Sequence, residues 1–164
     1  MQWVQFTGAL SMAAHLTGLI MRPSENWPRL AVAGGLYAAS LWIFWWTACT
    51  TRSPRLAIAF SPHMPDQIVQ TGPFRWVRHP FYLSYMLAWL AGGVGVAWPW
   101  AWLALPIMGA QYLHAIRHEE RQFLAGPLAE DYREYITKVG MLMPRVDGHS
   151  LAKPQLQKWG TREC

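Results

Sequence analysis

Three long stretches of the chain carry no Asp, Glu, Lys or Arg side chain. They cover residues 2–21, 30–50 and 80–116. A helix needs about 20 apolar residues to cross the hydrocarbon core of a bilayer, where no water is available to solvate a charge. The third stretch is 37 residues long, which is enough for two crossings. We therefore expect an all-α integral membrane protein with about four transmembrane helices.

The third stretch contains a predicted reversal, because three glycines precede Trp98-Pro99, and proline ends one helix and suits the first turn of the next. The expected elements are helices over about residues 2–21, 30–50, 80–97 and 99–117 and a cytoplasmic helical segment over 118–146. Residues 1–146 are treated as a single domain, and residues 147–164 as a loosely ordered tail. The first helix is the least apolar span and lacks the basic start of a signal peptide; whether it fully crosses the membrane is left open.

The Lys and Arg residues are distributed unevenly around the expected helices. Two lie between the first and second helices, four between the second and third, and eight from Arg117, at the end of the fourth, onward. Because Lys and Arg mark the cytoplasmic side, we expect an inner (cytoplasmic) membrane protein with both termini in the cytoplasm. Topology and contacts with anionic membrane lipids account for the net charge of +5, so no nucleic-acid partner is expected.

Basic residues gather where the third helix is expected to begin. The preceding loop ends in the string Gly72-Pro73-Phe74-Arg75-Trp76-Val77-Arg78-His79-Pro80-Phe81-Tyr82. Gly72-Pro73 is typical of a turn, and Pro80 suits the first turn of a helix. Two interpretations are open here. One is a basic anchor facing lipid headgroups, and the other is an anion or cofactor site at a helix N-terminus, where free N–H groups favour negative charge.

The fourth helix supplies polar residues that could converge on this site. Gln111, His114 and His118 fall at i, i+3 and i+7, so they share a face. Polar residues at membrane depth tend to face the bundle interior. Glu119 and Glu120 follow, and they also fit a solvated helix end. As a functional pair, the two carboxylates would suit a cationic ligand such as S-adenosylmethionine, whose own carboxylate would suit Arg or helix N–H groups.

The string from Gly72 to Tyr82 resembles the signature of the isoprenylcysteine carboxyl methyltransferase family, which is related to the phospholipid methyltransferases. In that family a helical hairpin follows, then a Glu-Glu pair, a Tyr-x-x-Tyr pair and a proline. This chain has the same order, with Glu119-Glu120, Tyr132 with Tyr135, and Pro144. The resemblance covers about residues 66–146, roughly half of the chain. Arg-His-Pro alone would be a weak signal, whereas the ordered series with a membrane hairpin inside it is specific.

The resemblance implies a methyltransferase that uses S-adenosylmethionine, held on the cytoplasmic side of the third and fourth helices and closed in by the C-terminal segment. The residues expected to bind the cofactor are Arg78, His79, Pro80, Tyr82, His118, Glu119 and Glu120. The chain departs from the family at Ser84, where glycine is usual, and at residues 124–128, where Phe-Gly is usual. These departures put a close helix contact and the path of the closing segment in question.

The expected reaction is in-line methyl transfer, in which the protein positions two reactants and excludes water. The expected substrate is a lipophilic small molecule or a lipid-linked group, methylated on a carboxylate, an amine or a thiol. Arg117 or Arg78 would orient a carboxylate, whereas His114, His118 or Glu120 would act as base for an amine or thiol. The acceptor and the oligomeric state are left open.

Two other classes of protein compete with this interpretation. The first is a non-catalytic membrane scaffold that retains the family fold, which the departures at Ser84 and residues 124–128 allow. The second is a haem or metal redox protein using His15, His79, His114 and His118, of which His114 and His118 are spaced as a metal pair. Six histidines are too few for a membrane di-iron enzyme, and His15 is the one intramembrane partner for a haem, so no metal site is expected.

Overall fold

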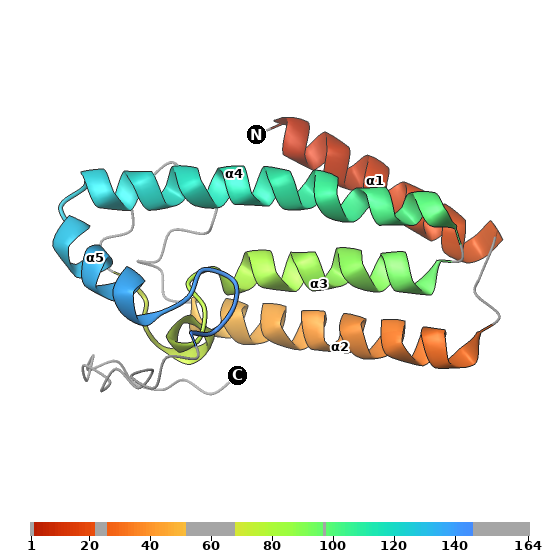
Figure 1. Ribbon diagram of the computed structural model, residues 1–164, viewed down its shortest axis with the longest axis horizontal. Helices are drawn as coiled ribbons and strands as arrows, with labels where there is room; N and C mark the ends of the chain where they lie inside the picture. The colour runs from red at the N-terminus through yellow and green to blue at the C-terminus, as the bar shows by residue number, and fades with distance from the viewer. Residues whose placement is uncertain (1, 22–25, 52–67, 97, 146–164) are drawn as a thin grey trace. The chain divides into compact units, whose positions relative to one another are not determined.

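The computed structural model describes residues 2–21, 26–51, 68–96 and 98–145. These residues form α-helices and two short 3-10 helices, and Val77 and Gly140 form an isolated parallel bridge. The helices in chain order are α1 (Gln2–Met21), α2 (Trp27–Thr50), η1 (Gly72–Arg75), α3 (Pro80–Gly95), η2 (Pro99–Leu103), α4 (Ala104–Ala125) and α5 (Ala129–Lys138) (Figure 1). The predicted all-α fold class is confirmed. The tail expected over residues 147–164 lies outside the described residues.

Helix α2 begins three residues earlier than the charge pattern indicated. The side-chain oxygen of Asn26 accepts a hydrogen bond from the N–H of Arg29 at 3.2 Å and so caps the helix. Pro28 lies in the first turn, where its missing N–H costs nothing. Arg29 therefore lies inside α2, because the capping contact, and not the hydropathy of the residues, decides where this helix begins.

The helix expected over residues 99–117 also differs from what the structure shows. It begins as the 3-10 helix η2 after Trp98, and α4 continues without a break to Ala125, well beyond Arg117. By length and hydropathy, one described helix qualifies as a membrane span. This is α2, with a mean hydropathy of 1.3 in its most apolar window, of which 11% is buried. Four crossings therefore stay a prediction.

The chain forms two compact units, which are described separately. Unit 1 comprises Met1–Trp42 and Tyr82–Arg117, and unit 2 comprises Ile43–Phe81 and His118–Cys164. Within unit 1, α1 lies beside the first turns of α4, where Gly8 approaches Met108 (Figure 1).

The helices of unit 1 are joined by hydrogen bonds as well as by apolar contacts. The Ser40 hydroxyl of α2 donates to the Ser84 carbonyl of α3 at 2.7 Å, and both residues are buried. The Trp89 indole of α3 donates to the Tyr112 hydroxyl of α4 at 3.0 Å. Each bond satisfies polar groups away from water, so it favours one packing of the helices over others. Ser84, where the related family has glycine, is thus part of a close contact between α2 and α3.

Unit 2 has an aromatic core around α5. Three buried residues form it, Tyr132, Tyr135 and Val139, and the partly buried residues packed against it are Ile68, Phe123, Leu124 and Ile136. The ring of Phe123 stacks on that of Tyr132, with centroids 4.6 Å apart and an interplanar angle of 15°. This core fixes α5 against the end of α4 and thereby positions the segment that follows α5.

Candidate functional site

A tight turn directs the chain into α3. Gly72 has a φ of +57°, in the left-handed region that favours glycine. A Cβ at this position would also collide with the side chain of Thr50. Buried Pro73 continues the turn, and its carbonyl accepts the N–H of Trp76 at 3.0 Å. The turn therefore sets the direction in which Arg78 enters the site.

The residues just before α3 are hydrogen-bonded to the segment after α5. The N–H of Arg78 donates to the Gly140 carbonyl at 2.8 Å, and the N–H of His79 donates to the Met141 carbonyl at 3.1 Å. Val77 and Gly140 form an isolated parallel bridge. This pairing brings together segments that are far apart in the sequence, and sequence reasoning did not find it because main-chain groups carry no residue signature.

Arg78, His79, Glu119 and Glu120 meet in unit 2, and we call them the Arg–His–Glu cluster. Glu120 Oε1 accepts a hydrogen bond from Arg78 Nε at 2.9 Å and lies 2.8 Å from the terminal Nη2. His79 Nε2 lies 3.1 Å from the same oxygen, and its Nδ1 lies 3.7 Å from Glu119 Oε2. Arg78 also donates to the Val139 carbonyl. The structure thus brings together four residues that the sequence assigned to a cofactor site.

The charge of Glu120 follows from these contacts. Burial by itself raises the pKa of Glu120, but hydrogen bonds from His79 and Arg78, and the positive charge of both, outweigh it. The pKa of Glu120 therefore lies below its ordinary value of 4.5. At neutral pH the cluster holds an ionised carboxylate whose side chain is 14% exposed.

The register of α4 explains why Glu120 faces the cluster. Met108, Tyr112 and Ile116 are buried, and residues four apart lie on neighbouring parts of one helix face. Glu120 continues this series. His114 is two positions from both Tyr112 and Ile116, which is about 200° around the helix, and its side chain is exposed.

The other polar candidates on α4 are exposed as well. Arg117 and His118 both have exposed side chains, and His118 Nε2 lies 3.2 Å from the side-chain nitrogen of Gln122. Spacing alone placed His114 and His118 on a common face, and we expected that face to be the interior one. The buried face is instead the one marked by Tyr112 and Ile116.

Pro80 and Tyr82 are both buried in α3. Pro80 begins the helix. The ring of Tyr82 lies edge-on to that of Tyr85, with centroids 6.3 Å apart, and 5.5 Å from that of Tyr112. These are contacts of a core aromatic residue in unit 1, and cofactor binding by Tyr82 stays a prediction.

Two tyrosines of α5, Tyr132 and Tyr135, interact electrostatically with Arg78 of the cluster. The Tyr135 hydroxyl donates to the Phe74 carbonyl in η1 at 2.6 Å. Burial raises the pKa of Tyr132 and of Tyr135 above the ordinary value of 10, so both hydroxyls are neutral at physiological pH. The spacing of Tyr132, Tyr135 and Ile136 on α5 is the signal that could have placed both tyrosines inward.

The chemistry of the cluster suits a ligand that carries both signs of charge. Carboxylates bind ammonium or sulfonium groups, and guanidinium or imidazolium groups bind a carboxylate. The amino-acid part of S-adenosylmethionine carries an ammonium and a carboxylate, so this donor set fits it. In the part of the chain that the structure describes, no three His, Cys, Asp or Glu side chains are grouped to hold a metal ion.

Sequence comparison relates this arrangement to known proteins. The family model for phospholipid methyltransferase matches residues 28–130, which is more than half of the chain. The chain belongs to the phospholipid methyltransferase family. This confirms the relationship that the Gly72–Tyr82 motif predicted, and the match includes every side chain of the Arg–His–Glu cluster.

The chain is also similar to a curated protein, over a shorter range of residues. The methanethiol S-methyltransferase of Mycobacterium tuberculosis (strain ATCC 25618 / H37Rv) is 37% identical over 78 residues, which are 47% of this chain and 30% of that protein. The similarity therefore spans less than a third of the length of that relative. No solved structure is significantly similar to the chain.

Proposed function

We propose that this member of the family is an integral membrane methyltransferase that uses S-adenosylmethionine and acts on a lipophilic or membrane-embedded acceptor. The observation that carries the proposal is the Arg–His–Glu cluster, in which Glu120 is held as a carboxylate between Arg78 and His79 at the start of α3. Membership of a methyltransferase family supports the reaction class.

Large apolar side chains on the outside of the helices support four membrane crossings. They include Leu10, Leu16, Ile20, Leu41, Trp42, Leu103 and Ile107, each at least 48% exposed. Soluble monomers rarely expose so many apolar side chains, whereas contact with lipid stabilises them. The distribution of Lys and Arg supports cytoplasmic termini in an inner membrane.

Each residue of the cluster has a distinct part in the proposal. When bound, S-adenosylmethionine supplies a methyl group made electrophilic by the adjacent sulfonium. Glu119, whose side chain is 26% exposed, binds the ammonium group, and ionised Glu120 adds a fixed negative charge beside it. Arg78 and His79 position Glu120. Pro80, Tyr82 and His118 are the remaining proposed cofactor-binding residues.

The acceptor decides which residues of α4 take part. The lowered pKa makes Glu120 a weak base, so it suits charge stabilisation better than proton removal. For a thiol or an amine, His114 stays the proposed base, and for a carboxylate, Arg117 stays the proposed orienting residue, although both side chains are exposed and His114 lies about 200° around α4 from the buried face. Thiols are the first acceptors to test, because the curated relative is named for methanethiol.

Calorimetric titration of S-adenosylmethionine into the detergent-purified protein tests the cofactor site. We expect saturable binding that is weakened about 10- to 100-fold in His79→Ala, Glu119→Gln and Glu120→Gln, because charge-assisted hydrogen bonds contribute about 1.5–3 kcal/mol each. Glu130→Gln is the matched control, since that carboxylate is 91% exposed on α5 and should leave binding unchanged. A folded wild-type protein that binds nothing, in detergent and in lipid nanodiscs, would refute the proposal.

A non-catalytic scaffold is the second candidate, and one observation favours it. The Arg78 side chain is 8% exposed and already bonded to Glu120 and to the Val139 carbonyl. The cluster therefore also holds α4 and the segment after α5 together. A scaffold would lose thermal stability in Glu120→Gln and would show no heat of S-adenosylmethionine binding even as wild type. The same titration therefore separates the two candidates.

A further inference from the structure

Helix α4 carries its basic side chains on one exposed face. His114, Arg117, His118 and Arg121 are all exposed, and we call them the basic stripe. Their spacing of i, i+3, i+4 and i+7 places them within about 100° of arc, because successive helical residues turn by about 100°. The buried face of the helix, marked by Ile116, lies on the other side. The basic stripe therefore faces outward from α4.

The two carboxylates of this part of α4 are kept apart from the basic stripe. Glu119 and Glu120 are engaged in the Arg–His–Glu cluster, where each contacts a basic side chain that precedes α3. The positive charge of Arg117 and Arg121 is therefore separated from the negative charge of the same helix. A surface that carries two guanidinium groups complements an anion, and a phosphate suits them best, because it accepts paired hydrogen bonds from a guanidinium group.

The same face of α4 is apolar closer to the start of the helix. Ile107 lies two helical turns before His114 and is 48% exposed, and Ala110 between them is exposed as well. About 15 Å of helix axis separates Ile107 from Arg117, and this is half the thickness of a hydrocarbon core of about 30 Å. The distance from the basic stripe to Ile107 therefore matches the acyl chains of one leaflet.

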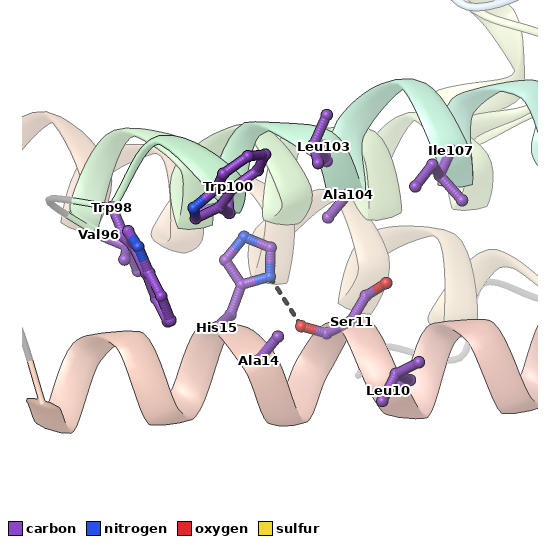
Figure 2. A pocket seen from close by; sticks show the side chains of 11 residues that line it. Leu10, Ser11, Ala14, His15, Val96, Trp98, Trp100, Leu103, Ala104 and Ile107 are labelled. Atoms are coloured by element: carbon purple, nitrogen blue, oxygen red, sulfur yellow. Dashed lines mark hydrogen bonds between the residues drawn. The ribbon is translucent and has the colours of Figure 1, made fainter.

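Ile107 also lines a cavity of about 280 Å³, which lies between α1 and the connection from α3 to α4 (Figure 2). Leu10 and Leu103 line it too and are 62% and 50% exposed, so the rim of the cavity lies at the surface of unit 1. Apart from Ser11 and His15, the lining side chains are aliphatic or indole. An apolar cavity of about 150 Å³ binds benzene, so this one has room for the last carbons of an acyl chain.

We propose that the outward face of α4 binds one anionic phospholipid. Its phosphate accepts hydrogen bonds from Arg117 and Arg121, and one acyl chain follows the apolar part of α4 and ends in the cavity at Ile107. Charge complementarity decides the occupant, because the ammonium of a zwitterionic headgroup offsets the charge of its own phosphate, whereas an anionic headgroup stays net negative. The inference rests on the proposed membrane insertion of the chain, and it does not depend on methyl transfer.

Nanodiscs with equal amounts of dioleoylphosphatidylglycerol and dioleoylphosphatidylcholine test the choice of headgroup. The full chain is released from them, and native mass spectrometry counts the lipids of each kind that stay bound. One arginine near an anionic headgroup favours it about fivefold, so wild type should retain phosphatidylglycerol about 25-fold over phosphatidylcholine. Arg121→Gln should lower this preference to about fivefold, and the double variant with Arg117→Gln to about one. Arg121 is also replaced alone because Arg117 has a second proposed part, the orientation of a carboxylate acceptor.

The matched control is Arg133→Gln, which removes the same charge from an arginine of α5 that is 61% exposed. The preference should stay at about 25-fold in this variant, because Arg133 lies outside the basic stripe. A loss equal to that in Arg121→Gln would show that net charge alone attracts the lipid, and it would refute a site on α4.

A phosphatidylglycerol with a diazirine at the end of one acyl chain tests the cavity. Photolysis should label α1 near Leu10 and α4 near Ile107, and Ala101→Phe, which fills the cavity, should remove the label. Label spread evenly over the helices, or displacement of the lipid by an equal concentration of sn-glycerol 3-phosphate, would overturn the inference. A wild type that stays outside the nanodiscs would overturn the proposed membrane insertion as well, whereas one that enters them and retains both lipids equally would overturn this inference alone.

Discussion

Replacing Glu120 by Gln removes the charge that Arg78 binds while keeping the size of the side chain. The two side chains are 14% and 8% exposed, so solvent screens the pair only weakly. Breaking a fully buried pair costs about 3–5 kcal/mol, and a charge-assisted hydrogen bond contributes about 1.5–3 kcal/mol. Because a Gln amide oxygen still accepts one weaker bond, we expect Glu120→Gln to lower the free energy of unfolding by about 2–3 kcal/mol.

The assay is a double-mutant cycle with Arg78→Met, in which unfolding is followed by circular dichroism during titration with sodium dodecyl sulfate in mixed micelles. The expected coupling energy between Arg78 and Glu120 is about 1.5–3 kcal/mol. The control cycle uses Glu130 and Arg133 on α5, which are 91% and 61% exposed and should couple by less than about 0.5 kcal/mol. If the two cycles gave the same coupling, the argument that Arg78 holds Glu120 in place would be wrong.

Three further outcomes follow from contacts in unit 2. The folded-state pKa of Glu120 lies below the unfolded value, so its contribution to stability is full above about pH 5 and is lost as the pH falls through the folded pKa. The stability difference between wild type and Glu120→Gln should therefore shrink in acid, and a constant difference would contradict this. Tyr135→Phe should cost about 1–2 kcal/mol in the same titration, because the Phe74 carbonyl loses its donor; no loss would argue against that bond. Gly72→Ala should cost at least about 1–2 kcal/mol, from left-handed backbone and the collision with Thr50, and a variant as stable as wild type would exclude that conformation.

The helices were predictable because apolar composition is a local property of the chain. The charge-free stretches located α1, α2 and α3, and Pro80 marked the residue at which α3 begins. The start of α2 was missed because one capping contact, from Asn26 to the N–H of Arg29, outweighs the polarity of the arginine. Hydropathy alone could not show that interaction.

The parts of the candidate site that depend on the identity of side chains could be predicted from the sequence. The motif around Arg78 and His79 and the later Glu pair indicated residues that the structure brings together. The orientation of α4 was misjudged because polar spacing was used, although the apolar series through Tyr112 and Ile116 points to the buried face and to Glu120. The Val139 carbonyl could not be predicted, since any residue has one and only tertiary structure brings it to Arg78.

The bridge between Val77 and Gly140 limits when contacts around Arg78 can form during synthesis of the chain. Ribosomes add about 5–20 residues per second, so Gly140 is synthesised roughly 3–13 s after Val77. During that interval α3 and most of α4 can fold, but the N–H of Arg78 has no Gly140 carbonyl to bind. The contacts of Arg78 with the Val139 and Gly140 carbonyls can therefore form only after α5 has been made, and a nascent chain released before Val139 would lack both of them.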